Sequence, residues 1–183
     1  MSDARPAATA TPLLDPASLT AMLRPRSVAI VGASNDPTRI GGRPLRYYRE
    51  NGFPGAVYPI NPNRDEIQGL KAYPDLASLP EAPDLVLVAI PAAAVVATAE
   101  EAAAKGARAM VIFSSGFAEM DDGDGQAMQD RLGEIARESG MRIAGPNCLG
   151  VFNAAIGHYC TFTASFDLGG FPHTGGIAIV SQS

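Results

Sequence analysis

The chain has 183 residues, of which 46% are hydrophobic and 18% charged, as in globular proteins, and its longest apolar runs are far shorter than the roughly 20 residues that cross a bilayer. The N-terminus lacks a basic segment followed by an apolar one, and two cysteines do not form a disulfide framework, so we expect a cytoplasmic protein with neither a membrane span nor a secretory signal. The formal net charge of −5 argues against nucleic acid as a partner.

The chain alternates between apolar runs and helical patterns. Residues 1–14 are predicted to be disordered, and Asp15-Pro16 predicts the start of a short helix. Apolar strands separated by helices predict a parallel sheet covered on both faces, an α/β doubly wound fold of the Rossmann-like kind. The predicted strands are 27–34, 56–62, 85–91, 107–116 and 142–147, and the predicted helices between them are 40–51, 92–105 and 124–139.

We expect three parts: an extension with a short helix at 1–22, a Rossmann-like domain at 23–150, and a segment at 151–183 that leads into a truncated second domain. The last part has no clear helix pattern and ends in an apolar strand at 176–183. We expect this strand to be ordered only by docking on the sheet or on another copy of the chain, which would favour a homo-oligomer.

Each unusual loop follows a predicted strand, and ligands of doubly wound sheets bind at the carboxyl ends of the strands. The first loop, Gly32-Ala33-Ser34, offers backbone N–H groups and a helix N-terminus to an anion. It is not a full G-x-G-x-x-G fingerprint, because Ser34 stands at the second glycine position, and a tight turn without a ligand is the alternative. We expect this loop and those at 61–64, 90–91, 114–117 and 145–150 to meet at one edge of the sheet.

The arginines indicate a phosphorylated ligand. Residues 24–64 carry a net charge of +5 in an acidic chain, which favours a small polyanion, with a solvated arginine-rich helix face as the alternative. The second strand ends without the carboxylate that binds the ribose of NAD, and Arg64 favours NADP or coenzyme A instead. Arg39, Arg43 and Arg46 are spaced on one face of the predicted helix and agree with several phosphates.

Six sequence blocks occur in order between Leu23 and Ser183: LRPRSVAIVGAS, YPINPNRDEIQGLKAYPDL, LVLVAIPA, SSGFAE, GPNCLG and GIAIVSQS. Together they resemble the N-terminal coenzyme A-binding domain of the ADP-forming acyl-CoA synthetases, relatives of the succinyl-CoA synthetase α subunit. The resemblance implies that the chain takes part in converting carboxylate, ATP and CoA to acyl-CoA, ADP and phosphate, or in the reverse reaction.

The resemblance also implies contacts with coenzyme A for a set of residues at the strand ends. They are Gly32, Ala33 and Ser34 for phosphate, Asn61 and Pro62 for adenosine, Arg64 for phosphate in place of a frequent lysine, Ile90 and Pro91 for the nucleotide or pantetheine, Ser114, Ser115 and Gly116 for the pantetheine path, and Asn147 and Cys148 for the thiol end.

The phosphorylated histidine and the ATP-grasp domain of the family have no counterpart in this sequence. His158 and His173 match no phosphohistidine motif, and we interpret both as surface or packing residues. We therefore predict no catalytic residue and no metal, and expect the missing ligase and ATP-grasp domains in cis or as another subunit. A stand-alone CoA- or NADP-binding regulatory module is the alternative, with an NADP-dependent oxidoreductase domain as a third possibility.

Two residues have alternative interpretations. Glu119 could position a phosphohistidine from a partner domain, or it could be an acid that favours the N-terminus of the next helix. Cys148 could form a mixed disulfide with CoA, or it could be a small apolar packing residue.

Overall fold

The computed structural model describes residues 16–120 and 123–181, so the predicted disorder at 1–14 and the predicted cap at Asp15 lie outside the described residues. A five-stranded parallel sheet has the order β2-β1-β5-β6-β7. Each strand is shorter than its predicted run, because the end of the run forms the loop at the strand's carboxyl end. The strands are β1 (Ser27–Val31), β2 (Ala56–Ile60), β5 (Leu85–Val88), β6 (Ala109–Ile112) and β7 (Arg142–Ala144).

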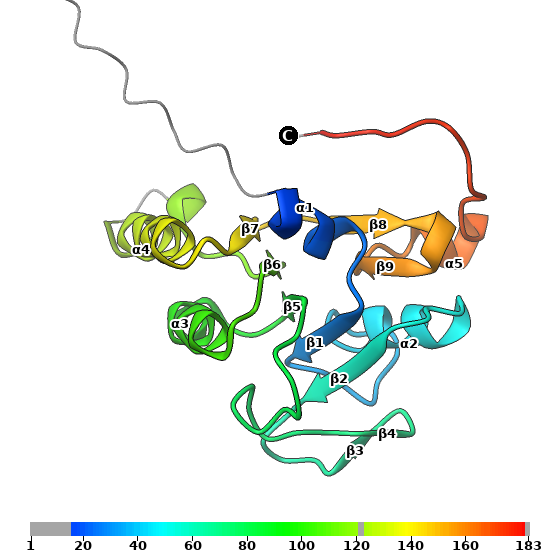
Figure 1. Ribbon diagram of the computed structural model, residues 1–183, viewed down its shortest axis with the longest axis horizontal. Helices are drawn as coiled ribbons and strands as arrows, with labels where there is room; N and C mark the ends of the chain where they lie inside the picture. The colour runs from blue at the N-terminus through cyan, green and yellow to red at the C-terminus, as the bar shows by residue number, and fades with distance from the viewer. Residues whose placement is uncertain (1–15, 121–122, 182–183) are drawn as a thin grey trace, which may run out of the picture.

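Helices cover both faces of the sheet, which confirms the doubly wound α/β prediction (Figure 1). Helices α3 (Val95–Lys105) and α4 (Gly123–Ser139) pack on one face. Helices α1 (Pro16–Leu23) and α2 (Arg43–Glu50) pack on the other. Helix α3 ends where Gly106 adopts a left-handed φ of 90°, as its position after the apolar pattern predicts.

Two hydrophobic cores lie on either side of the sheet, and strand residues alternate between them. On β5, Val86 and Val88 face α3 and α4, whereas Leu85 and Leu87 face α1 and α2. All four side chains are fully buried, which explains why a continuous apolar run forms a central strand.

A hairpin completes the α1/α2 face and was not predicted. It consists of β8 (Gly150–Asn153) and β9 (His158–Thr161), and α5 (Ser165–Gly169) follows it. Cys160 and Val151 from the hairpin pack into the core beneath α2. The short helix corrects the expectation that no helix occurs after residue 150.

The predicted strand at the C-terminus is wrong for its described part, since residues 176–181 form no strand. Ile177, Ile179 and Val180 are 88%, 86% and 99% exposed, so the predicted docking on the sheet is also wrong. A strand needs a neighbouring strand for its backbone hydrogen bonds, and residues 176–181 are exposed and pair with none of the described strands. Association with another copy stays a prediction.

None of the helices in the described part of the chain is long and apolar enough to cross a membrane.

Candidate functional site

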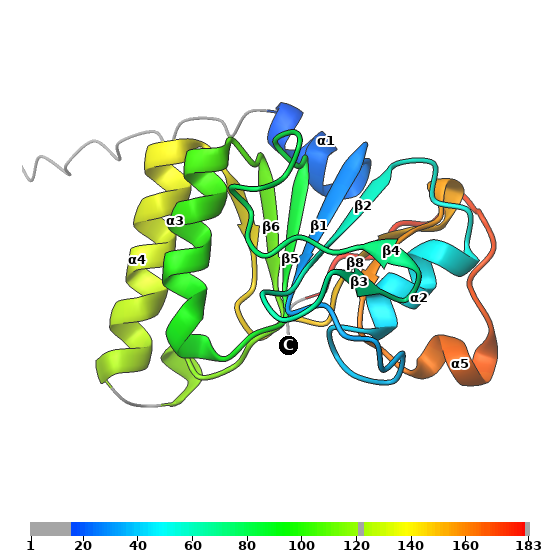
Figure 2. The same cartoon turned by 90° about the horizontal axis from the view of Figure 1, so that it is seen from below.

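The topology places a switch point between β1 and β5. From β1 the chain continues to β2 on one side, whereas β5 lies on the other side, and ligands of doubly wound sheets bind where the strand order reverses. The loops after β1 and β5 contain Gly32 and Ile90. The carboxyl ends of the strands lie together at the lower edge of Figure 2.

Close contacts join the loops that follow neighbouring strands. A Cβ on Gly32 would lie 2.4 Å from the Ala89 carbonyl oxygen, so the loops after β1 and β5 touch through their backbones. The side-chain amide of Asn61, after β2, donates to the Ala33 carbonyl at 3.0 Å. The Ser114 hydroxyl, after β6, donates a short hydrogen bond to the Ile90 carbonyl.

The loop after β7 joins the same cluster. The backbone N–H of Asn147 donates to the Ser114 carbonyl at 2.9 Å. Residues with predicted ligand contacts therefore meet along one edge, from β2 to β7. We call this set the strand-edge cluster: Gly32, Ala33, Ser34, Asn61, Pro62, Arg64, Ile90, Pro91, Ser114, Ser115, Gly116, Asn147 and Cys148.

The members of the cluster differ in what they offer a ligand. The N–H groups of Gly32 and Ala33 both donate to the Ile60 carbonyl, at 3.2 and 3.3 Å, and are not free for a phosphate. The Ser34 N–H has no hydrogen-bond partner among the described residues. The first loop thus offers an anion the backbone of Ser34, which is fewer donors than its sequence suggests.

Arg64 lies at the surface of the cluster. Its side chain is exposed, and it forms no ion pair within residues 16–120 and 123–181. A guanidinium without a carboxylate partner can bind phosphate through charge-assisted hydrogen bonds. Arg64 is thus a cation of the cluster that a ligand can use.

Arg39, Arg43 and Arg46 do not share one helix face as predicted, because α2 begins at Arg43, and phosphate binding by them stays a prediction. Arg39 precedes α2 and pairs with Asp36 at 3.6 Å. Arg46 pairs with Asp167 of α5 at 2.6 Å, and Arg43 lies 3.5 Å from the same carboxylate. The hydrogen bond from Arg46 lowers the pKa of Asp167. Arg43 and Arg46 share the single carboxylate of Asp167, and these ion pairs hold α5 against α2.

Glu119 fixes the loop that follows β6. Its carboxylate accepts hydrogen bonds from the backbone N–H groups of Gly116 at 2.7 Å and Phe117 at 3.2 Å. The bond from Gly116 contributes most to lowering the pKa of this carboxyl. Both oxygens are used within the loop, so Glu119 shapes the turn next to Ser115, and a role toward a phosphohistidine stays a prediction.

Cys148 is a half-buried member of the strand-edge cluster. Its thiol points to the carbonyl oxygens of Ile112 at 3.4 Å and Ala144 at 3.7 Å, and burial raises its pKa. This environment supports the packing interpretation, because a thiol with a raised pKa holds little thiolate at neutral pH.

We expect Cys148 to react slowly with a chromogenic disulfide reagent at pH 7, because its thiol is protonated and half-buried. Thiol release in the folded chain should be much slower than in the same chain unfolded by urea. A Cys160→Ala variant assigns the signal to Cys148. Fast labelling of the folded variant would instead support a mixed disulfide with CoA.

Gln68 belongs to this edge but was not among the predicted residues. Its side chain bonds to the carbonyls of Ser34 and Gly42. Gly69 is a turn signal, but sequence spacing does not show which loop such a turn contacts.

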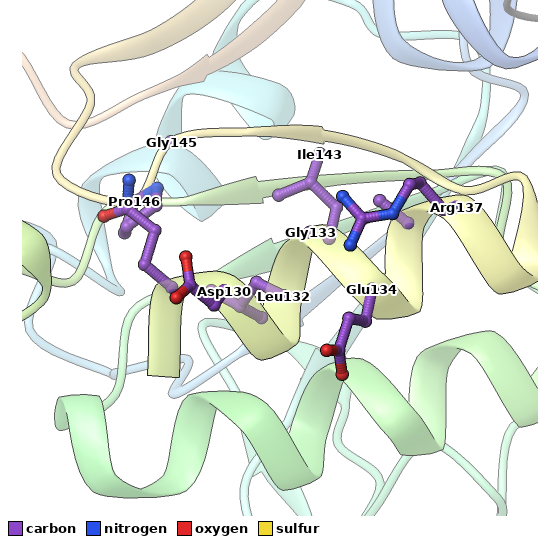
Figure 3. Close-up of a pocket in the computed structure, with 10 residues that line it drawn as sticks. Asp130, Leu132, Gly133, Glu134, Arg137, Ile143, Gly145 and Pro146 are labelled. Atoms are coloured by element: carbon purple, nitrogen blue, oxygen red, sulfur yellow. The ribbon is translucent and has the colours of Figure 1, made fainter. Parts of the chain in front are cut away.

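A hollow of about 560 Å³ lies elsewhere, between α4 and the edge strand β7 (Figure 3). Asp130, Glu134 and Arg137 of α4 line it together with Ile143 and Pro146. No member of the strand-edge cluster lines this hollow. In the described part of the chain, no group of three or more His, Cys, Asp or Glu side chains could hold a metal ion.

A family profile described as a CoA binding domain matches residues 26–154. The chain belongs to this family. The match includes the entire strand-edge cluster, and coenzyme A is the ligand that the family name gives.

The CoA-binding domain is similar to parts of several longer enzymes. It is 45% identical over 132 residues to trans-feruloyl-CoA synthase from an unknown prokaryotic organism, and the match covers 72% of this chain and 18% of that protein. It is 36% identical over 159 residues to the subunit alpha of ADP-forming acetate–CoA ligase II of Pyrococcus furiosus, which covers 87% of this chain and 33% of that subunit.

A solved structure has the same fold. The dinucleotide-forming acetyl-coenzyme A synthetase 1 of Candidatus Korarchaeum cryptofilum, in complex with phosphate and ADP, superposes with a TM-score of 0.73 at 35% identity, over 79% of this chain and 30% of that chain. The CoA-binding domain is thus related to ADP-forming acetyl-CoA synthetases and spans about a fifth to a third of the length of these relatives.

Proposed function

We propose that the strand-edge cluster binds coenzyme A, with Arg64 and the loop at Ser34 contacting phosphate and the loops at Ser114 and Asn147 bordering the pantetheine arm. The observation that carries the proposal is the position of an unpaired arginine and an unpartnered Ser34 N–H at the switch point of a CoA-binding fold. The half-buried Ile90 supplies an apolar surface for the uncharged part of the ligand.

The same proposal gives the chain a place in a larger enzyme. Similarity to a subunit alpha of an ADP-forming ligase supports a role as the CoA-binding part of an ADP-forming acyl-CoA synthetase. The nucleotide site and the phosphohistidine would come from further domains or another subunit, and residues 151–183 would lead toward them. A cytoplasmic location also stays a prediction.

Ligand stabilisation tests the proposal, because a ligand that binds only the native state raises its stability by mass action, by about 2.7 kcal/mol at 100 times Kd. We expect CoA to raise the melting temperature more than dephospho-CoA does, and NADP and NAD to have little effect. A larger shift with NADP would favour the alternative of an NADP-binding module. No shift with any of the four would contradict a nucleotide site.

Arg64→Ala is expected to weaken CoA binding by on the order of 1.5–3 kcal/mol, about ten- to a hundredfold in Kd, because a charge-assisted phosphate contact is lost. Folding should be unaffected, since Arg64 is exposed. Calorimetric titration with CoA measures the effect. Arg24→Ala, another exposed arginine at the end of α1, is the matched control and should bind CoA normally. Equal affinities of the two variants would remove Arg64 from the site.

A further inference from the structure

The turn between two short strands carries an unusual residue. Strands β3 (Glu66–Ile67) and β4 (Leu70–Lys71) form a hairpin in which Ile67 pairs with Leu70, leaving a two-residue turn. Both turn residues have positive φ, 49° at Gln68 and 80° at Gly69, which is the pattern of a type I′ turn. Asn, Asp or Gly normally occupies its first position, so glutamine is a costly choice for the turn alone.

Among the described residues other than glycine, positive φ is confined to this edge of the sheet. In the described residues, Gln68 and Asn147 are the two that adopt it. Asn147 belongs to the strand-edge cluster, and asparagine tolerates this conformation, whereas glutamine has no such preference. A backbone outlier next to a candidate site is a reason to ask what its side chain does there.

The Gln68 side chain closes the loop that leads from β1 to α2. Its Nε2 donates to the carbonyl oxygens of Ser34 and Gly42, each at 2.9 Å, so both N–H groups of the amide are used. The backbone N–H of Gln68 donates to the Asn35 Oδ1 at 2.7 Å. Ser34 and Gly42 stand at either end of the segment between the phosphate loop and the helix, and one carboxamide joins them.

The hairpin also connects this loop with the segment that carries Arg64. Ile67 is fully buried in the core that includes Ala33, which fixes the hairpin against the loop. At its open end, the N–H of Ala72 donates to the carbonyl of Asp65, the residue after Arg64, at 2.8 Å. The hairpin lies beside β2 and α2 (Figure 1). Gln68 thus stands where the two phosphate-contacting elements meet.

We infer that Gln68 is a positioning residue for phosphate binding: its carboxamide holds the 34–42 loop in register with the hairpin, so that Ser34 and Arg64 reach the same ligand. This inference rests on the proposed function. The side chain acts through the loop and through its own hairpin, and makes no contact with the ligand itself.

Substitutions that favour the turn but remove the amide bridge test this role. Gln68→Gly suits positive φ, and Gln68→Asn suits it while placing the amide one methylene short of the two carbonyls. We expect both variants to melt close to the temperature of the unaltered chain, because relief of the positive φ at residue 68 offsets the two lost hydrogen bonds. We expect them to bind CoA about tenfold more weakly, because the 34–42 loop is then ordered only on binding. A residue needed for the fold alone would lower the melting temperature instead.

Hydrogen exchange supplies a second readout that needs no ligand. The amides of residues 34–42 should exchange faster in both variants, while those of β5 and β6 exchange as in the unaltered chain. Variants that bind CoA more weakly but whose 34–42 amides are equally protected, or variants with unchanged affinity, would overturn the positioning role. Loss of folding in both variants would also overturn it, because it would show a structural role.

The unaltered chain separates this inference from the function on which it rests. If the unaltered chain does not bind CoA in calorimetry, both the proposed function and the positioning role fail. If it binds CoA and Gln68→Gly binds equally well, the positioning role alone fails.

Discussion

Gly32→Val is expected to destabilise the domain by about 2–5 kcal/mol and to abolish CoA binding. The backbone φ of 85° is unfavourable for a residue with a Cβ by roughly 1–2 kcal/mol. The Cβ would also lie 2.4 Å from the carbonyl oxygen of Ala89 and 2.9 Å from its carbon, and these are backbone atoms that move only with β5. Overpacking of this kind adds about 1–3 kcal/mol. Urea unfolding and calorimetry with CoA measure the two effects.

A matched control separates the contact from the conformation. Gly140 has a φ of 74°, and a Cβ there would meet no atom within 4 Å. Gly140→Ala should therefore cost only the conformational part, about 1–2 kcal/mol, and leave CoA binding unchanged. If Gly32→Ala is no less stable than Gly140→Ala, the close approach of the loops after β1 and β5 is not a constraint on this position.

Lowering the pH from about 6.5 to about 4 is expected to remove about 3 kcal/mol of stability through His158 alone. Its ring is fully buried, with Nδ1 2.9 Å from the Tyr48 hydroxyl and Nε2 3.0 Å from the Met22 carbonyl. Because a carbonyl only accepts, Nε2 carries the proton and Nδ1 accepts from Tyr48, so the neutral ring is satisfied. Burial lowers the pKa of His158 to about 4.

The direction in which stability changes with pH follows from proton uptake. Between pH 6.5 and about 4 the unfolded chain binds a proton at His158 and the folded chain does not, so stability falls through this range and levels off below it. Urea unfolding at several pH values should show this slope, and His158→Gln should lose it while other groups titrate unchanged. Parallel pH profiles for the two chains would contradict a neutral buried histidine.

His158 also illustrates how far residue type predicts role. A histidine without a matching motif was interpreted as a packing or surface residue, and the structure confirms packing: the ring joins β9 to α1 and α2. Its two partners lie more than 100 residues away in the chain. The sequence predicted a packing or surface role for His158, but it could not identify Tyr48 and Met22 as its hydrogen-bond partners.

The arginines of α2 show the opposite outcome. Their spacing suggested a phosphate-binding face, yet Arg43 and Arg46 bind a carboxylate about 120 residues further along the chain. A charge pattern on one helix is local, whereas its partner depends on which segment packs opposite. Asp167 lies on a short helix that the sequence did not predict, so its competition with a ligand for these arginines could not be foreseen.

The residues of each segment were enough to predict the sheet and its loops. The continuous apolar run at 85–88 can only be buried on both faces, Gly106 can end a helix in a left-handed conformation, and strand ends rich in Gly, Pro, Asn and Ser must form loops. These properties depend on each segment's own residues, and parallel topology then brings the loops to one edge. The Rossmann-like fold and the location of the strand-edge cluster follow from them.

Contacts between distant segments could be identified only in the folded structure. The bridge from Gln68 to Ser34 and Gly42, the occupied N–H groups of Gly32 and Ala33, and the exposed residues 176–181 each depend on what lies next to them in space. Hydrogen-bond donors and apolar side chains take the partners that packing brings within reach, and packing is decided by all the elements together. For this reason the sequence could locate the edge at which we propose that a ligand binds, while the groups that are free to bind it were identified only in the tertiary structure.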